Sequence, residues 1–257
     1  MRENLKFSNT LIMWYLINQR DLPWRKSNDP YLIWLSEIIL QQTRIAQGTS
    51  YYEKFASEFD DVFDLAKADE KTVLKLWQGL GYYSRARNLN STAKIIASQY
   101  KGQFPNSYKE LIKLKGIGDY TASAIASIAF NQPHATVDGN VFRVLSRVFG
   151  INTPINESKG IKEFKLLAEE LLNPDDPGTH NQALMEFGAL VTGKKPAFTR
   201  ALAEDYVGRY QYVDGSPTIE AFGYTPHELQ NTMRDSLEWF AKIGVLNPEI
   251  AARLDKS

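Results

Sequence analysis

The stretch Leu114-Lys-Gly-Ile-Gly-Asp-Tyr-Thr-Ala122 contributes most to the predicted fold. Its two glycines, Gly116 and Gly118, are separated by one residue and allow a tight hairpin between the helix that ends near Leu114 and the small-residue helix that begins at Tyr120. The amides of such a hairpin, together with the N-terminus of the second helix, can face a phosphate group. A plain connection between two helices has the same Gly-x-Gly pattern, so the function of this stretch depends on the rest of the chain.

Helical signals surround this hairpin from the N-terminus to about residue 192. Capping residues precede apolar residues at helical spacing, and almost no alternating strand pattern is present. The sequence therefore predicts an all-α body. The predicted helices span residues 8–19, 29–45, 69–77, 84–100, 107–114, 120–130, 138–149, 158–172 and 181–191.

The composition is that of an ordinary globular protein, with 43% hydrophobic and 23% charged residues among 257. No apolar run reaches the length of a membrane span, and Met1-Arg-Glu-Asn4 does not open a secretion signal. We therefore expect a cytoplasmic protein that does not contact membranes. The net charge of zero counts mildly against a nucleic-acid binder, although local basic groups and helix N-termini can hold phosphates without a basic average.

A change in composition near Gly193 predicts a domain boundary. Lys194-Lys-Pro196 breaks the preceding helix, and Asp214-Gly-Ser-Pro217 is typical of a turn. Thr225-Pro226 then opens an amphipathic pattern that continues to Phe240. We therefore predict a helical domain over residues 1–192 and a short C-terminal tail of mixed turn and helix over residues 193–257.

Glu37 is the first candidate catalytic residue. It is the only ionisable acid in Tyr31-Leu-Ile-Trp-Leu-Ser-Glu-Ile-Ile-Leu40, a helix that is apolar on nearly all sides and is therefore expected to be buried. Burial raises the pKa of a carboxyl group, which is how a protein keeps a general acid protonated near neutral pH. The alternative is a structural carboxylate that faces solvent or pairs with an arginine.

Asp138 is the second candidate, in Thr136-Val-Asp-Gly-Asn-Val141. An aspartate at this position can cap the helix that follows, through Phe149, and capping is the commoner role of such a residue. Taken separately, neither Asp138 nor the glycine hairpin identifies a function.

The two motifs belong to an ordered set that resembles MutY-type adenine DNA glycosylases of the helix-hairpin-helix superfamily. The resemblance covers roughly residues 5 to 192. Each motif is short, but their order and spacing are specific. The set comprises Leu22-Pro-Trp-Arg25, Trp34-Leu-Ser-Glu-Ile-Ile-Leu-Gln-Gln-Thr43, Gly79-Leu-Gly-Tyr-Tyr-Ser-Arg-Ala-Arg-Asn88, Leu114-Lys-Gly-Ile-Gly118, Val137-Asp-Gly-Asn140 and His180-Asn-Gln182.

The resemblance implies a role for each matching residue. Glu37 would protonate adenine at N7, and Asp138 would stabilise or briefly bond to the oxocarbenium-like sugar, a division of labour between two carboxyl groups that glycosidases also use. The target base would have to be extruded from the duplex. The remaining implied residues are Tyr120 and Asn140 in support of catalysis, Arg25, Leu40 and Gln182 at the flipped base, and Gln41, Gln42, Thr43, Tyr82, Gly116 and Gly118 on the DNA.

Tyr120 also separates this chain from the endonuclease III class, which carries a lysine there and cuts the strand through a Schiff base. The absence of that lysine implies a monofunctional glycosylase.

The chain departs from the family pattern in two places. Most MutY-type enzymes follow the helix of Asn181–Gly188 with four cysteines that hold a [4Fe–4S] cluster, whereas this chain has no cysteine, so we expect no cluster and no other cofactor. The tail lacks the alternating strands of the family's 8-oxoguanine-reading domain. Instead, Phe222-Gly-Tyr-Thr-Pro226 and Leu237-Glu-Trp-Phe240 resemble the C-terminal segment of extended short-chain reductases and sugar-nucleotide epimerases.

No Gly-x-Gly-x-x-Gly motif follows a predicted strand, so we expect no nicotinamide cofactor and no reductase activity. The predicted function is hydrolysis of the N-glycosidic bond of adenine mispaired with 8-oxoguanine or guanine in double-stranded DNA, by a monomer. Two alternatives remain open, namely a glycosylase for mispaired thymine or uracil, and a catalytically impaired DNA-binding protein of the same fold.

Overall fold

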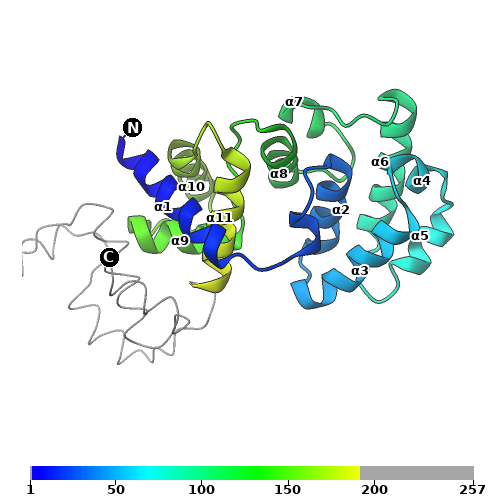
Figure 1. The fold of residues 1–257 in the computed structure, drawn as a ribbon, viewed down its shortest axis with the longest axis horizontal. Coiled ribbons are helices and arrows are strands. Elements are labelled where there is room, and N and C mark those ends of the chain that lie inside the picture. Colours follow the sequence, from blue (N-terminus) through cyan, green and yellow to red (C-terminus); the bar gives the residue numbers. More distant parts are fainter. Residues whose placement is uncertain (1, 192–257) are drawn as a thin grey trace, which may run out of the picture. The chain divides into compact units, whose positions relative to one another are not determined.

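The computed structural model describes residues 2–191 (Figure 1). The regular elements of this part of the chain are all helices, with no strand among them, so the predicted all-α body is confirmed for it. Our expectations for the tail lie outside the described residues. The chain divides into two compact units. Within the described part, unit 1 comprises residues 2–19, 137–173 and 182–191, and unit 2 comprises residues 20–136 and 174–181. None of the helices between residues 2 and 191 is long and apolar enough to cross a membrane.

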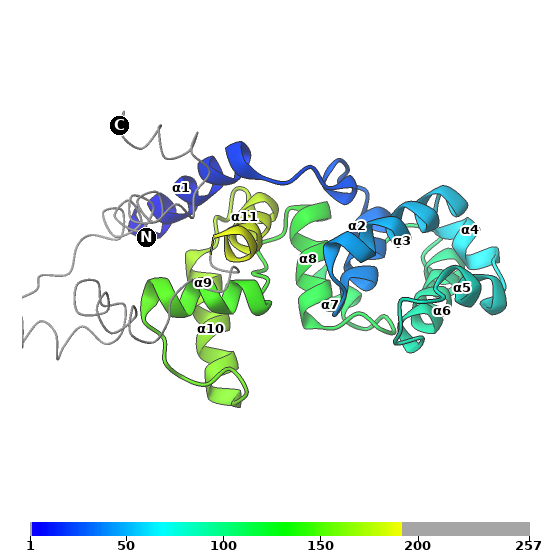
Figure 2. The same ribbon diagram turned by 90° about the horizontal axis from the view of Figure 1, so that it is seen from below.

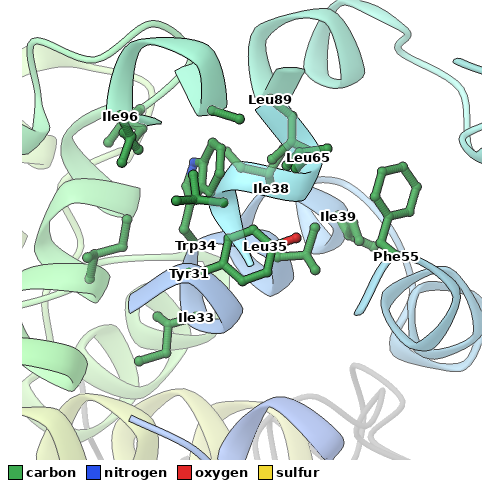
Figure 3. Packing of buried hydrophobic residues seen from close by; sticks show 14 of the residues in the cluster. Tyr31, Ile33, Trp34, Leu35, Ile38, Ile39, Phe55, Leu65, Leu89 and Ile96 are labelled. Atoms are coloured by element: carbon green, nitrogen blue, oxygen red, sulfur yellow. The ribbon is translucent and has the colours of Figure 1, made fainter. Parts of the chain in front are cut away.

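Unit 2 is built around α2 (Pro30–Leu40), which packs against η1 (Pro23–Arg25), α3 (Ile45–Glu58), α6 (Ser84–Gln99) and α8 (Asp119–Phe130). Asp29 caps α2 by accepting the N–H of Tyr31 at 2.8 Å, and Pro30 supplies the fixed φ of the first turn. Trp34, Leu35 and Ile39 are almost completely buried (Figure 3). The prediction of a central apolar helix is therefore correct.

Three shorter helices complete unit 2. Helices α4 (Val62–Lys67) and α5 (Glu70–Leu76) both pack on α6. Helix α7 (Tyr108–Leu111) packs on α8. The helices predicted over residues 69–77 and 107–114 open with Asp69 and Ser107. These two residues are the N-caps of α5 and α7, because each side chain accepts an amide N–H of its helix. Phe55 from α3 and Leu65 from α4 join Leu89 and Ile96 of α6 in the apolar core of this unit (Figure 3).

Unit 1 contains α1 (Arg2–Asn18), α9 (Gly139–Phe149), α10 (Ser158–Leu171) and the larger part of α11 (Pro177–Leu190). α10 packs against both α1 and α9. It crosses α9 at a steep angle (Figure 2). Edge-to-face aromatic pairs join the helices: Phe7 of α1 with Phe149 of α9, Trp14 of α1 with Phe187 of α11, and Phe142 of α9 with Phe164 of α10.

Several predicted boundaries are wrong. Helix α1 begins at Arg2 instead of Ser8, and α2 ends at Leu40 instead of continuing to Ile45. The prediction also missed α3 and α4. α3 does carry an amphipathic signal, because Gly48, Tyr52 and Phe55 are buried at helical spacing, but the helix begins only after a turn at residues 41–42 that no proline or glycine marks.

His180, in the first turns of α11, is buried in unit 2 and has a depressed pKa. Its side chain is about 1% exposed, and burial lowers the pKa to about 4 despite the nearby Asp176. In the unfolded chain an imidazole has a pKa of about 6.5. The unfolded state therefore binds one more proton than the native state between these two values.

We expect this histidine to make folding stability fall as the pH is lowered from about 6.5 towards 4, by up to roughly 1.4 kcal/mol per pH unit. Urea denaturation between pH 7 and pH 4.5, compared with His180→Gln, measures the contribution. The variant should show a shallower pH dependence, because glutamine does not titrate. Identical slopes for the two proteins would show that His180 is not held neutral by the fold.

Candidate functional site

Asp138 is the N-cap of α9, as the sequence predicted. Its Oδ1 accepts the backbone N–H of Asn140 at 2.9 Å and of Val141 at 2.8 Å. Its Oδ2 accepts the side-chain amide of Asn140 at 2.6 Å. The carboxylate therefore lies at the positive end of the α9 dipole, with both oxygens held by N–H donors. Capping and chemistry do not compete for this residue, because the cap fixes the half-buried carboxylate in one orientation.

Asn140 is positioned by two neighbours that could not be identified from the sequence. Arg143, one turn further along α9, donates to its Oδ1. Gly188 of α11 packs directly on its backbone: a Cβ at Gly188 would lie 2.5 Å from the Asn140 carbonyl oxygen and 2.7 Å from the Asn140 Cβ. Only glycine allows α11 to come this close to the start of α9 without displacing atoms. The spacing of Gly188 to Asn140 in sequence gives no local signal of this contact.

Gln182 also belongs to unit 1, on α11, and is half-buried. Its Oε1 accepts the hydroxyl of the buried Tyr15 at 2.8 Å. In this bond the amide oxygen faces Tyr15 and the NH₂ group of Gln182 points away from it. Tyr15 is therefore an orienting residue, whereas its sequence pattern indicated only an apolar helix face.

The remaining residues of the predicted site lie in unit 2. Glu37 on α2 is half-buried, between the fully buried Ser36 and Ile38. The helix around Glu37 is buried as predicted, whereas Glu37 itself is buried only in part. Tyr120, in the first turn of α8, is also half-buried.

Gly116 and Gly118 form the predicted hairpin between α7 and α8. Gly116 has φ +81°, and a Cβ there would lie 2.8 Å from the Cβ of Asn88, so both its conformation and its surroundings require glycine. Gly118 is the N-cap of α8, and a Cβ there would meet no heavy atom within 4 Å beyond its chain neighbours. Both glycines are exposed, whereas Ile117 between them is buried and anchors the hairpin in the core.

Residues Gln41, Gln42 and Thr43 form a tight turn after α2. Gln41 has φ −53° and ψ 116°, Gln42 has φ +53°, and the N–H of Thr43 donates to the Leu40 carbonyl at 3.1 Å. These are the features of a type II turn, whose third position normally requires glycine or asparagine. The exposed Gln42 is therefore held in an unfavourable conformation at the tip of the turn.

Tyr82 is a second exposed residue with positive φ. Its φ is +47°, its side chain is 66% exposed, and it follows Gly79 and Gly81, which also have positive φ. Among the described residues only four non-glycine residues have positive φ, and Gln42 and Tyr82 are two of them. Strained conformations of this kind concentrate at functional sites.

Arg25 and Leu40 were the other residues predicted at the flipped base. Arg25 ends η1, is half-buried, and its Nη1 donates to the Arg20 carbonyl at 3.4 Å. Leu40, the last residue of α2, lies over Gly48: a Cβ on that glycine would meet its Cδ2 at 2.6 Å. Both residues lie in unit 2, with Gln41, Gln42 and Tyr82.

Asn181 of the His180-Asn-Gln182 motif has a structural role in unit 2. Its amide NH₂ donates to the His134 carbonyl at 2.8 Å and to Ser127 Oγ at 2.9 Å, and its Oδ1 accepts the N–H of Thr136 at 3.1 Å. The segment that leads towards Asp138 is thus tied to α8 and α11 by one buried side chain.

The donor set for a metal centre does not fit the family's cluster. The chain has no cysteine, and residues 2–191 contain no group of three or more His, Asp and Glu side chains arranged to hold a metal ion. The residues present therefore do not fit a cysteine-held [4Fe–4S] cluster.

The sequence of the chain matches a known protein family. Residues 35–170 match the family described as HhH-GPD superfamily base excision DNA repair protein, and the chain belongs to this family. The helix-hairpin-helix fold inferred from the ordered motifs is thereby confirmed.

Several similar relatives carry one name. The chain is 38% identical to the adenine DNA glycosylase of Rattus norvegicus, over 96% of this chain and 52% of the rat protein. It is 43% identical to the adenine DNA glycosylase of Buchnera aphidicola subsp. Baizongia pistaciae, over 73% of this chain and 53% of that protein. The chain thus spans about half the length of these relatives, and the resemblance to MutY-type glycosylases is confirmed.

Solved structures give the same fold. A thermostable thymine-DNA glycosylase is 30% identical, with a TM-score of 0.68 over 76% of this chain and 90% of that chain. An endonuclease III–DNA complex is 18% identical, with a TM-score of 0.60 over 73% of this chain and 85% of that chain, which shows a shared fold only.

The contact between Gly188 and Asn140 gives a test of the site's packing. Replacing a glycine inside a helix by alanine normally stabilises it by about 1 kcal/mol. We expect Gly188→Ala to destabilise the protein instead, by roughly 1–3 kcal/mol, because its Cβ would overlap the Asn140 backbone. Gly139→Ala is the matched control, since its Cβ would meet only Arg143 Nη1, at 3.9 Å.

Chemical denaturation of both variants measures the difference. A Gly188→Ala variant at least as stable as the Gly139→Ala control would contradict the close packing of α11 on the start of α9.

Proposed function

We propose that this chain is a monofunctional DNA glycosylase that hydrolyses the N-glycosidic bond of adenine mispaired in double-stranded DNA. The observation that carries the proposal is the Asp138 carboxylate, held by three N–H donors at the start of α9 in the Val-Asp-Gly-Asn motif of this family. The relatives named adenine DNA glycosylase support adenine as the base that is released.

Asp138 would stabilise positive charge on the deoxyribose as the bond to the base breaks. A carboxylate that is already fixed needs no reorganisation when the oxocarbenium-like sugar forms, and this preorganisation is a large part of electrostatic catalysis. The Asn140 amide, itself held by Arg143 and by the packing of Gly188, keeps Oδ2 in place. Asn140 is thus a positioning residue in the proposed reaction.

Glu37 would act as the general acid. Its proton passes to N7 of adenine, the bond between C1′ and N9 breaks, and the bonding electrons leave with the neutral base. Water then adds to C1′ and gives one of its protons to the Glu37 carboxylate. This leaves an abasic site and restores the enzyme. Gln182, with its amide oriented by Tyr15, and Arg25 would hold the extruded adenine.

DNA would be bound by backbone groups more than by net charge, which is zero for the chain. The hairpin glycines Gly116 and Gly118 and the N-terminus of α8 offer amides to a phosphate. Gln42 and Tyr82, exposed on strained turns, would enter the base stack beside the mispair, while Gln41 and Thr43 complete the first of these turns. We propose no cofactor and a monomeric, DNA-associated protein.

Tyr120 supports hydrolysis without strand cleavage. A Schiff base with the sugar requires an amine, which a phenol does not provide. The family class that cuts the strand carries lysine at this position of the second hairpin helix.

The first test is Glu37→Gln. Glutamine keeps the shape of the side chain but has no carboxyl proton to donate, so we expect single-turnover release of adenine to fall by roughly 10²–10⁴-fold. Binding to a duplex with adenine opposite 8-oxoguanine should remain near that of the wild type. Glu53→Gln, on the exposed side of α3, is the matched control and should release adenine normally.

Excision by Glu37→Gln at the rate of the Glu53→Gln control would remove Glu37 from the chemistry. A wild-type protein that binds the duplex and releases no base would favour the alternative of a catalytically impaired DNA-binding protein.

A second candidate substrate is thymine or uracil mispaired with guanine. The likeness to a solved thymine-DNA glycosylase, at 30% identity and a TM-score of 0.68, is the observation in its favour. A panel of duplexes with adenine opposite 8-oxoguanine, adenine opposite guanine, thymine opposite guanine and uracil opposite guanine separates the two. We expect adenine to be released faster than thymine or uracil, and the reverse order would replace our proposal with the second candidate.

A further inference from the structure

The two strained turns of unit 2 share one buried side chain. Arg85, in the first turn of α6, has only 9% of its surface exposed. Its Nη1 donates to the Gln41 carbonyl at 2.5 Å, and its Nη2 lies 3.4 Å from the Gly81 carbonyl. These are the carbonyl groups of the residues directly before Gln42 and Tyr82, the two exposed residues with positive φ.

The same guanidinium also closes the end of α2. Nη1 lies 3.1 Å from the carbonyl oxygens of both Ile38 and Ile39, which are left without an intrahelical partner where α2 stops. A cation at a helix C-terminus is favoured by the helix dipole as well. Arg85 therefore fixes the point from which the Gln41–Gln42 turn departs.

Aromatic rings hold Arg85 from the other side. Its guanidinium carbon lies 5.1 Å from the centre of the Trp77 ring and 5.6 Å from the centre of the Tyr82 ring. Trp77 Nε1 donates to the Gly81 carbonyl at 2.8 Å, which ties the second turn to the same cluster. Lysine could not reproduce this set, because it lacks the planar fork that reaches two turns and stacks on rings at once.

The hydrogen bond to Gln41 has a specific conformational effect. A type II turn differs from a type I turn by rotation of the central peptide, and only the type II form requires positive φ at the third residue. The carbonyl of that central peptide belongs to Gln41. Its bond to Arg85 therefore favours the type II form, and thus positive φ at Gln42, over the less strained type I form.

We propose that Arg85 is a positioning residue that holds Gln42 and Tyr82 in the conformations from which both side chains enter the DNA stack. It would touch neither the base nor the reacting sugar. The proposal rests on the proposed function for its consequence in DNA, but its conformational part concerns the protein alone.

The conformational part is tested without DNA. NMR scalar couplings and ¹³C chemical shifts report the sign of φ at Gln42 and Tyr82 in the wild type, Arg85→Lys and Arg85→Met. We expect both residues to leave positive φ, partly in Arg85→Lys and more fully in Arg85→Met. Arg87→Met is the matched control, because Arg87 is an exposed residue of the same helix, paired with Glu70, and loses the same charge. Unchanged φ values in Arg85→Lys would overturn the proposal. This variant decides the test even if Arg85→Met does not fold.

The DNA part uses a duplex with 2-aminopurine next to an adenine–8-oxoguanine pair, whose fluorescence rises when the stack is opened. We expect Arg85→Met or Arg85→Lys to reduce this rise and to weaken binding to the mispaired duplex by roughly ten- to a hundredfold, the range for loss of a charged hydrogen bond. Binding to a fully paired duplex should stay near that of the Arg87→Met control.

A double-mutant comparison then separates positioning from general damage. If Arg85 acts through the two inserted side chains, its substitution should add little to a Gln42→Ala/Tyr82→Ala protein. An equally large loss in that background would overturn the proposal. A wild-type protein that neither prefers mispaired DNA nor releases a base from it would defeat the proposed function instead. The NMR measurement would still decide the role of Arg85.

Discussion

The hydrogen bonds between Asp138 and the first amides of α9 set the start of that helix and the place of the charge on which the proposed chemistry depends. Oδ1 accepts two backbone N–H groups and Oδ2 accepts the Asn140 side chain. Other contacts of unit 1 hold the same Asn140 or lie on the neighbouring α11. Gly188 lets α11 lie against the Asn140 backbone, Arg143 holds the Asn140 side chain, and Tyr15 orients the Gln182 amide on the same helix as Gly188.

Unit 2 contains two exposed residues whose backbone conformation is unfavourable for a residue other than glycine. Gln42 and Tyr82 both have positive φ, and the buried Arg85 contacts the carbonyl groups of the residues directly before them. The hairpin is similar, because the buried Ile117 anchors it while Gly116 and Gly118 on either side remain exposed. In each case a core contact made by a neighbouring residue presents the group proposed to meet DNA.

The parts of this structure that local chemistry specifies were predictable from sequence. Asp29, Asp69, Ser107 and Asp138 cap helices where the pattern placed them, and the Gly116 hairpin has the expected form. The end of α2 was not predictable, because a type II turn with glutamine at its third position leaves no glycine signal. Contacts between distant residues, such as Tyr15 with Gln182 and Gly188 with Asn140, have no local signature either. The partial exposure of Glu37 depends on which neighbours cover that side of α2, and the apolar pattern of the helix does not specify this.

If the fixed Asp138 carboxylate stabilises positive charge on the sugar, the protein should distinguish a charged analogue of that sugar from a neutral one. Affinity is measured for two duplexes with 8-oxoguanine in one strand, one with a cationic pyrrolidine opposite it and one with a neutral tetrahydrofuran of similar shape. An enzyme complementary to a cationic transition state binds the cation more tightly. We expect wild-type protein to prefer the pyrrolidine duplex by at least about tenfold, a difference of about 1.4 kcal/mol, and Asp138→Asn to lose most of that preference. An unchanged preference in Asp138→Asn would contradict the account.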